Sequence, residues 1–216
     1  MKFGPLVTLG AVVVLGAGIW FVNVSQETKP ASPPAPVAAS PPTTAAPVAA
    51  SPVAVPPTAF PPKADYVGKV QASSGVVTLE ITVAADKAIA YACDGKKVEA
   101  WLRGSAVNGV VNLASKDNTS RLDGHLEGDK VIGTLFLHQE QLSFTAAQSQ
   151  PPAGLYTYLQ DGVRDSWIID QNNAVTGVQR RPDGSTSPAP SLSTNGTATV
   201  NGQSVAATRV QGDSNV

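Results

Sequence analysis

The chain has 216 residues, of which 42% are hydrophobic and 14% are charged, and its formal net charge at pH 7 is −1. A near-neutral chain without a basic stripe is not typical of nucleic-acid-binding proteins, so we expect no nucleic-acid partner. The single cysteine, Cys93, excludes an internal disulfide and a CxxC metal or redox pair.

The N-terminal segment contains an apolar run from Phe3 to Val24 without a charged side chain. A membrane core of about 30 Å requires roughly 20 apolar residues in a helix, so residues 1–27 are predicted to be an uncleaved transmembrane anchor. Lys2 precedes the run and Glu27 follows it, a slight bias that favours a cytoplasmic N-terminus and an exported remainder in the periplasm or cell wall. The alternative is a cleaved signal, with residues 16–18 as the cleavage site, and a secreted protein.

The second segment, residues 28–63, consists almost wholly of Pro, Ala, Val, Ser and Thr, with 12 prolines between Pro30 and Lys63. Such a composition predicts a disordered linker with polyproline II character. At about 3.1 Å per residue the linker would hold the rest of the chain well away from the membrane. The rival interpretation, a proline-rich ligand for an aromatic groove, lacks a repeated PxxP register with basic flanks.

Short β-type runs separated by turn signals occupy residues 64–147, a pattern typical of an all-β sandwich or barrel. Eight strands are predicted, at residues 66–72, 76–84, 88–93, 98–103, 110–114, 121–127, 131–137 and 142–147. The turns between them carry Gly, Asn or Asp, as in Asn108-Gly109. Because the connections are short, we predict an antiparallel meander that forms either a closed barrel or a two-sheet sandwich.

Apolar and polar residues alternate in the second of these strands, from Val77 to Val83, which predicts one buried face and one polar face that includes Glu80. Three large residues fall on the nominally polar face of their strands: Trp101, Ile132 and Phe136. Exposed apolar groups of this size need cover, so we expect the C-terminal part of the chain to pack over them. Because many inward residues are alanines, the interior is predicted to be either tightly packed or spacious.

The C-terminal part begins after Pro151-Pro152 and is predicted to add three strands, at residues 155–159, 164–169 and 174–179. The predicted β-domain therefore spans residues 64–181, as the meander at 64–147 and a three-strand extension at 154–181. A polar tail, residues 182–216, contains a hairpin signal at Asn201-Gly202. Aromatic side chains gather in the extension, where they either pair across strands or recognise a glycan or partner: Tyr156, Tyr158 and Trp167.

Candidate metal ligands occur at alternate positions of one predicted strand, at Asp123, His125 and Glu127, with His138 at the end of the next strand. This spacing places the first three on one face, where they could bind zinc or manganese. The alternative, a solvated strand face, is preferred, so we predict no metal and no cofactor. Cys93 is expected to be a buried apolar side chain, with an intermolecular disulfide as the alternative.

Two stretches, Ala88–Gly104 and Leu155–Val210, resemble exported or membrane-anchored proteins of actinobacteria, mycobacteria among them, that have no assigned activity. The resemblance implies an N-terminal span or signal, a Pro/Ala linker and a β-rich domain in the cell envelope. It carries no catalytic motif.

These observations predict a membrane-anchored cell-envelope protein whose exported β-domain is a protein-interaction or scaffold module. One alternative is a barrel-type carrier of a small apolar ligand such as a lipid, which requires an internal cavity of about 300 Å³ or more. A metal-dependent enzyme is the weaker alternative. We expect no enzyme activity, because no nucleophile, base and orienting group can be assembled from the motifs.

Overall fold

The computed structural model describes residues 58–216. The predicted anchor at residues 1–27 and the predicted linker up to residue 57 lie outside the described residues. Within residues 58–216, no helix has the length and apolar character needed to cross a membrane.

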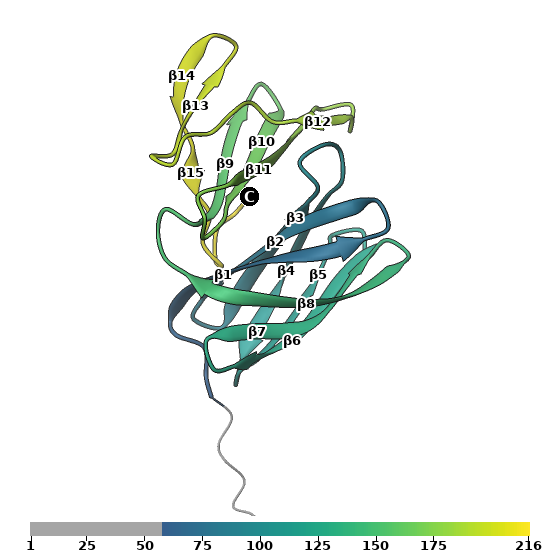
Figure 1. Cartoon of the computed structure of the whole chain (residues 1–216). Helices are drawn as coiled ribbons and strands as arrows, with labels where there is room; N and C mark the ends of the chain where they lie inside the picture. The colour runs from purple at the N-terminus through teal and green to yellow at the C-terminus, as the bar shows by residue number, and fades with distance from the viewer. Residues whose placement is uncertain (1–57) are drawn as a thin grey trace, which may run out of the picture. The chain divides into compact units, whose positions relative to one another are not determined.

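Eight antiparallel strands close into a barrel, in which each strand pairs with the next along the chain (Figure 1). The barrel closes because β1 pairs with β8, where Tyr66 lies opposite Gln148 and Val67 opposite Ala147. Of the two predicted all-β arrangements, the barrel is therefore the one that forms. The strands are β1 Lys63–Ala72, β2 Gly75–Ala84, β3 Lys87–Cys93, β4 Glu99–Val107, β5 Val110–Ala114, β6 Ser120–Glu127, β7 Lys130–Leu137 and β8 Glu140–Ser149.

Tight turns join the barrel strands where the chain offers residues that tolerate a positive φ. Asn108 and Gly109 turn β4 into β5 with φ of 51° and 73°, as the Asn-Gly pair predicts. His138 turns β7 into β8 with a φ of 55°, although no turn dipeptide marks this position. The structure therefore places His138 in a turn, just beyond the strand end.

Side chains fill the barrel interior as one continuous apolar cluster. Large aliphatic residues from strands all around the barrel are fully buried in it, among them Leu79, Leu102, Leu122 and Leu135. Phe60 adds to this cluster from outside the strands and packs edge-on against Tyr66, with 6.0 Å between ring centroids. Residues 58–62, predicted as linker, thus contact the barrel.

A second sheet of five strands follows the barrel, in the order β12-β11-β10-β9-β15, and a separate hairpin pairs β13 with β14. Three of these strands coincide with the predicted extension, whereas β12 and β15 do not follow from the sequence pattern. The hairpin turns at Asn201-Gly202, as predicted. The bounds are β9 Gly154–Gln160, β10 Val163–Ile169, β11 Val175–Arg180, β12 Thr186–Pro188, β13 Thr197–Val200, β14 Gln203–Ala206 and β15 Thr208–Arg209.

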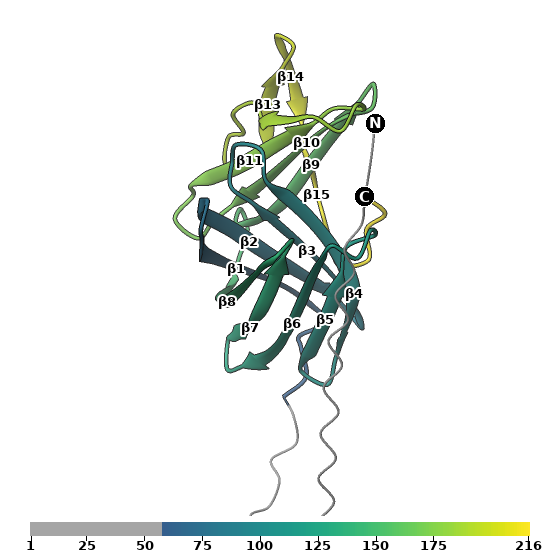
Figure 2. The ribbon, with the colours of Figure 1, turned by 90° about the vertical axis from the view of Figure 1, so that its right-hand side faces the viewer.

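The second sheet packs against the outer face of the barrel near β1–β3 (Figure 2). Ile89 and Tyr91 from the outside of β3 meet Ile168 and Val178 of the sheet in one buried cluster, against which Trp101 packs. The polar face predicted for β2 is therefore covered, because this sheet buries its outward side chains as well. A barrel strand covered on both sides resembles the strands of a sandwich core.

The prediction that the C-terminal part covers three large outward residues is correct for Trp101 and wrong for the other two. Ile132 and Phe136 belong to neither cluster that the second sheet forms. Phe136 instead lies under the guanidinium of Arg121 on the neighbouring strand β6, 4.1 Å from the ring centroid. A cation above an aromatic face is a favourable local cover, so no distant segment is required there.

The opposite face of the second sheet buries the aromatic residues that the sequence singles out. Tyr156 and Trp167 pack with Leu192, Ala198 and Val200 from the segment that includes β13. The indole Nε1 of Trp167 donates a hydrogen bond of 2.7 Å to the Pro190 carbonyl. The packing interpretation is thus confirmed for Tyr156 and Trp167.

Candidate functional site

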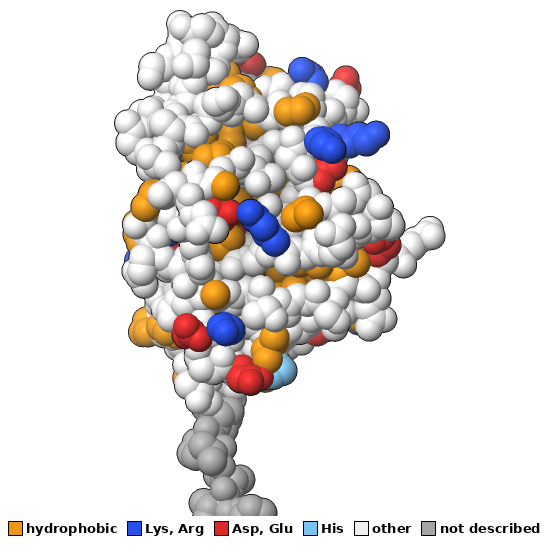
Figure 3. Space-filling model, in the orientation of Figure 1, with side chains coloured by type: hydrophobic (Ala, Val, Ile, Leu, Met, Phe, Trp, Pro, Cys, Tyr) orange, Lys and Arg blue, Asp and Glu red, His pale blue; other side chains and the backbone are white. Residues whose placement is uncertain are grey.

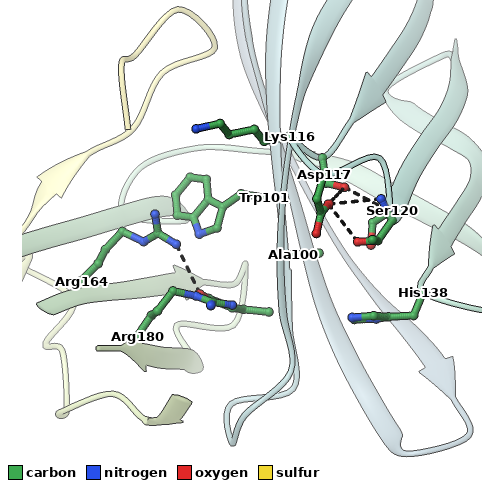
Figure 4. Close-up of a pocket in the computed structure, with 11 residues that line it drawn as sticks. Ala100, Trp101, Lys116, Asp117, Ser120, His138, Arg164 and Arg180 are labelled. Atoms are coloured by element: carbon green, nitrogen blue, oxygen red, sulfur yellow. Dashed lines mark hydrogen bonds and ion pairs between the residues drawn. The ribbon is translucent and has the colours of Figure 1, made fainter. Parts of the chain in front are cut away.

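A groove of about 610 Å³ lies between the barrel and the second sheet. The turns β5–β6 and β7–β8 form one wall, and strands β10 and β11 form the other. Figure 4 shows Arg164 and Arg180 on one side, Asp117 and His138 on the other, and Trp101 between them. The groove therefore joins residues that lie up to 81 positions apart in the chain.

Glu99, the first residue of β4, anchors the sheet side of the groove. Its side chain is only 1% exposed, and its Oε1 accepts hydrogen bonds from Arg164 Nη2 at 3.3 Å and from Arg180 Nε. Its Oε2 accepts a bond of 3.1 Å from the Tyr91 hydroxyl, whose pKa burial raises well above its ordinary value. A buried carboxylate is tolerated when it is paired in this way.

Arg164 and Arg180 lie directly opposite each other on β10 and β11. Like charges in that position repel, which destabilises a strand pair. Glu99 relieves the repulsion because one carboxylate contacts both guanidinium groups. The barrel therefore supplies the charge that lets the second sheet hold two arginines side by side.

Trp101 follows Glu99 by two residues and faces the same side of β4. Its ring lies 4.6 Å from the Tyr91 ring and 5.0 Å from the Arg164 guanidinium carbon. Both Trp101 Nε1 and Arg164 Nε are buried and have no hydrogen-bond partner among the described residues. An unpaired buried donor costs about 1–3 kcal/mol, so these two atoms are a local cost of packing the second sheet against β4.

Asp117 defines the opposite wall, in the turn between β5 and β6. Its Oδ1 accepts bonds from the Ser115 hydroxyl at 2.6 Å and from the Thr119 hydroxyl at 2.9 Å. These bonds lower the pKa of Asp117 to about 2, so the carboxylate stays ionised and the turn stays closed. Lys116 and His138 are exposed along the same wall.

Of the candidate metal ligands, only His125 and Glu127 come close to each other, with 3.9 Å between Nε2 and Oε2, and their side chains are 60% and 70% exposed. Asp123 pairs instead with Arg121 at 2.7 Å. His138 lines the groove, which lies at the end of the barrel where β6 begins. Glu127 is the last residue of β6 and therefore lies at the opposite end of the barrel. In the part of the chain that the structure describes, no three His, Cys, Asp or Glu side chains are placed to hold a metal ion.

Cys93 is fully buried and free, in the cluster between the barrel and the second sheet. Burial raises the pKa of its thiol to about 12. Its predicted role as a buried apolar side chain is confirmed, and a thiol in this position is inaccessible to a second molecule.

A second polar cluster lies between the barrel and the second sheet, around Glu80. This side chain is 0% exposed, so the prediction that it lies on a solvent-facing side of β2 is wrong. Arg209 on β15 donates from Nη2 to Asp65 Oδ2 at 2.9 Å and to the Ala153 carbonyl at 2.7 Å. These contacts join the edge of the sheet to β1, beside Glu80.

Sequence reasoning did not bring the groove residues together. Trp101 carried a signal, as a large residue on a polar face, but Glu99, Arg164 and Arg180 look like ordinary surface charges. Their meeting depends on the register of β10 with β11 and on where the sheet packs on the barrel. Neither can be derived from one sequence.

Comparisons with known proteins add no functional assignment. No protein-family model, no curated protein and no solved structure matches this chain. The groove is therefore the feature on which a functional proposal can be built.

Proposed function

We propose that this chain is a membrane-anchored cell-envelope protein whose exported β-domain is a protein-interaction or scaffold module. The observation that carries the proposal is a barrel interior filled by side chains, next to an open polar groove on the outside. A domain of this kind offers its binding groups on its surface. It acts by binding rather than by catalysis and needs no cofactor.

The carrier alternative uses the same closed eight-stranded barrel but requires space inside it. Small barrels either fill their interior with side chains or enclose one ligand. Here Leu79, Leu102, Leu122 and Leu135 are fully buried in a single cluster, and an apolar ligand would have to displace such residues. The packing therefore favours the interaction module.

The groove is a better candidate for the partner surface than an apolar patch. Among residues 58–216, the exposed large hydrophobic side chains are five valines and one leucine, including Val76, Val107 and Leu159. On the face seen in Figure 3, hydrophobic groups are interrupted by polar and charged ones. Scattered residues of this kind are normal on a monomer, so they do not indicate a docking site.

The proposed location rests on the sequence alone. The apolar run Phe3–Val24 has the length of a membrane span, and the proline-rich segment that follows ends at the barrel. In this arrangement the N-terminus of the anchor lies in the cytoplasm. The proline-rich segment is the spacer that presents the β-domain to a partner in the envelope. Secretion after signal cleavage is the alternative.

Native mass spectrometry of the full-length chain, isolated in mild detergent from its own host, tests the proposal. We expect no small molecule to be released on denaturation, and we expect a photoreactive residue at position 116 to form an adduct with one defined protein. The matched control is the same residue at Lys130, which is exposed on β7 away from the groove. A bound apolar molecule, or equal adducts at both positions, would contradict the interaction module.

A further inference from the structure

We propose that the groove binds an oxyanion, the carboxylate or phosphate group of its ligand, through the terminal guanidinium N–H groups of Arg164 and Arg180. The inference rests on the proposed binding function and specifies its chemistry. It is carried by two partly exposed arginines that one buried carboxylate orients and only partly occupies.

Glu99 occupies only part of the donor capacity of the two arginines. It accepts from Nη2 of Arg164 and from Nε of Arg180. Arg164 Nε is buried and out of reach of a ligand, but no bond occupies Arg164 Nη1 among the described residues, and the one further bond that Arg180 makes there is a long one of 3.3 Å from Nη1 to the Gly184 carbonyl. Because a guanidinium carries five N–H groups, several remain for a ligand.

The acceptor closest to these donors is already engaged, because Glu99 is almost fully buried and takes three bonds. On the opposite wall, Asp117 Oδ1 is held by its own turn. A ligand that supplies acceptor atoms is therefore favoured over one that supplies donors. Planar guanidinium groups match carboxylate and phosphate oxygens, and such charge-assisted bonds are about twice as strong as neutral ones.

The arginines are oriented before a ligand arrives. Arg164 is held by Glu99 at 3.3 Å and lies over the Trp101 ring at 5.0 Å, while Trp101 itself is in contact with Tyr91. Side chains already fixed in this way lose less conformational entropy on binding than free surface arginines. Trp101 Nε1 is buried beside them, so its N–H resonance reports a change at the Arg164 guanidinium without contacting the ligand itself.

The charge of the groove suits one anionic group rather than a polyanion. Three cations, Lys116, Arg164 and Arg180, face two anions, Glu99 and Asp117. The whole chain carries a net charge of −1. An extended polyanion such as nucleic acid would require a continuous basic surface, which this groove does not provide.

NMR of the full-length chain provides a site-specific test, because the indole N–H of Trp101 gives its own resonance, assigned by its loss in Trp101→Phe. The probes are inorganic phosphate and N-acetyl-triglycine, a peptide with a single carboxylate. We expect at least one probe to shift the Trp101 signal saturably, with a Kd on the order of 1 mM, while the Trp167 signal stays in place. Trp167 is the internal control because its N–H already bonds the Pro190 carbonyl.

Arg180→Gln and Arg164→Gln are each expected to weaken binding by about 10- to 100-fold, the loss of one or two charge-assisted bonds. Arg121→Gln is the matched control: it removes the same charge from the outer face of β6, where Arg121 contacts Asp123 and Phe136. Lys116→Gln, an exposed substitution, keeps the test valid if an arginine variant fails to fold. It should weaken binding by about two- to threefold.

Each outcome has a definite meaning. A response to the peptide alone assigns a carboxylate ligand, and a response to phosphate alone assigns a phosphate ligand. No shift of Trp101 with either probe, or equal weakening by Arg121→Gln and Arg180→Gln, would overturn the oxyanion site. If position 116 still cross-links a partner in that case, the interaction module stands and only the oxyanion inference fails.

Discussion

Replacing Glu80 by Gln is expected to stabilise this protein at neutral and alkaline pH. Glu80 is fully buried between the barrel and the second sheet, and neither of its oxygens accepts a hydrogen bond from a described residue. Burial raises its pKa well above the ordinary value of 4.5; the nearby charge of Asp65 adds to this, and Arg209 opposes it. Glu80 therefore keeps its proton in the folded state and donates it to Asp65.

The direction in which stability changes with pH follows from whether Glu80 holds its proton in the folded and in the unfolded chain. Below pH 4.5 Glu80 is protonated in both the folded and the unfolded chain, so its pKa shift costs nothing. Above this pH the unfolded chain releases the proton while the folded chain holds it, and the free energy of unfolding falls as pH rises through the window up to the raised pKa. Within this window each pH unit costs about 1.4 kcal/mol.

Glutamine keeps the shape of the protonated glutamate and can still donate to Asp65, but it has no proton to lose. We expect Glu80→Gln to leave the free energy of unfolding nearly unchanged at pH 4 and to raise it above that pH, by about 1.4 kcal/mol per pH unit until the raised pKa is reached. Burial also raises the pKa of Asp165, but this group titrates alike in both proteins and cancels from the difference.

Urea unfolding followed by tryptophan fluorescence between pH 4 and 8.5 measures this difference. Glu127→Gln is the matched control, because its side chain is 70% exposed, and it should change stability by less than about 0.5 kcal/mol. A variant Glu80→Gln that is less stable than the parent at pH 7.5, or a difference that does not grow with pH, would show that Glu80 is ionised and well paired. The reasoning on burial would then be refuted.

Three further predictions concern packing. Ile168→Ala, in the cluster between barrel and sheet, should lower the free energy of unfolding by about 2–5 kcal/mol in urea, whereas Leu159→Ala, at a position 69% exposed, should change it by less than about 0.5. Phe60→Ala should cost about 1–3 kcal/mol in the same assay, since Phe60 is half-buried against Tyr66; no loss would mean that residues 58–62 do not hold the barrel. Cys93, with a pKa of about 12, should react with a thiol reagent at pH 8 only as fast as the chain opens, and immediate reaction in the native protein would contradict its burial.

The β-strands of the barrel show which features can be predicted from residues close together in the chain. The alternation in β2 and the turn at Asn108-Gly109 both depend on residues next to each other in the chain, so they predict strand positions and short antiparallel connections. The same signals leave barrel and sandwich open. Closure depends on the pairing of β1 with β8, about 80 residues apart in the chain, and no local pattern contains that register.

The groove and the Glu80 cluster show that the burial of a side chain can depend on a distant segment, which local sequence patterns do not reveal. Glu80 and Glu99 occupy polar positions in alternating strands, a pattern that predicts exposure, and both are buried because a second sheet covers that side of the barrel. For His125 and His138, by contrast, the sequence suggested a proximity that the fold does not produce. His125 lies on an exposed strand face, whereas His138 lies in a turn that lines the groove.

Local patterns were enough to predict the all-β class, the approximate strands of the barrel, the tight turns and which face of β2 points inward. These properties follow from backbone geometry and side-chain polarity over a few residues. Only the tertiary structure decided that the barrel closes, that its interior is filled, and that Glu99 holds Arg164 and Arg180 at one groove. Those outcomes depend on contacts between distant segments, whose relative position is set by the packing of the whole domain.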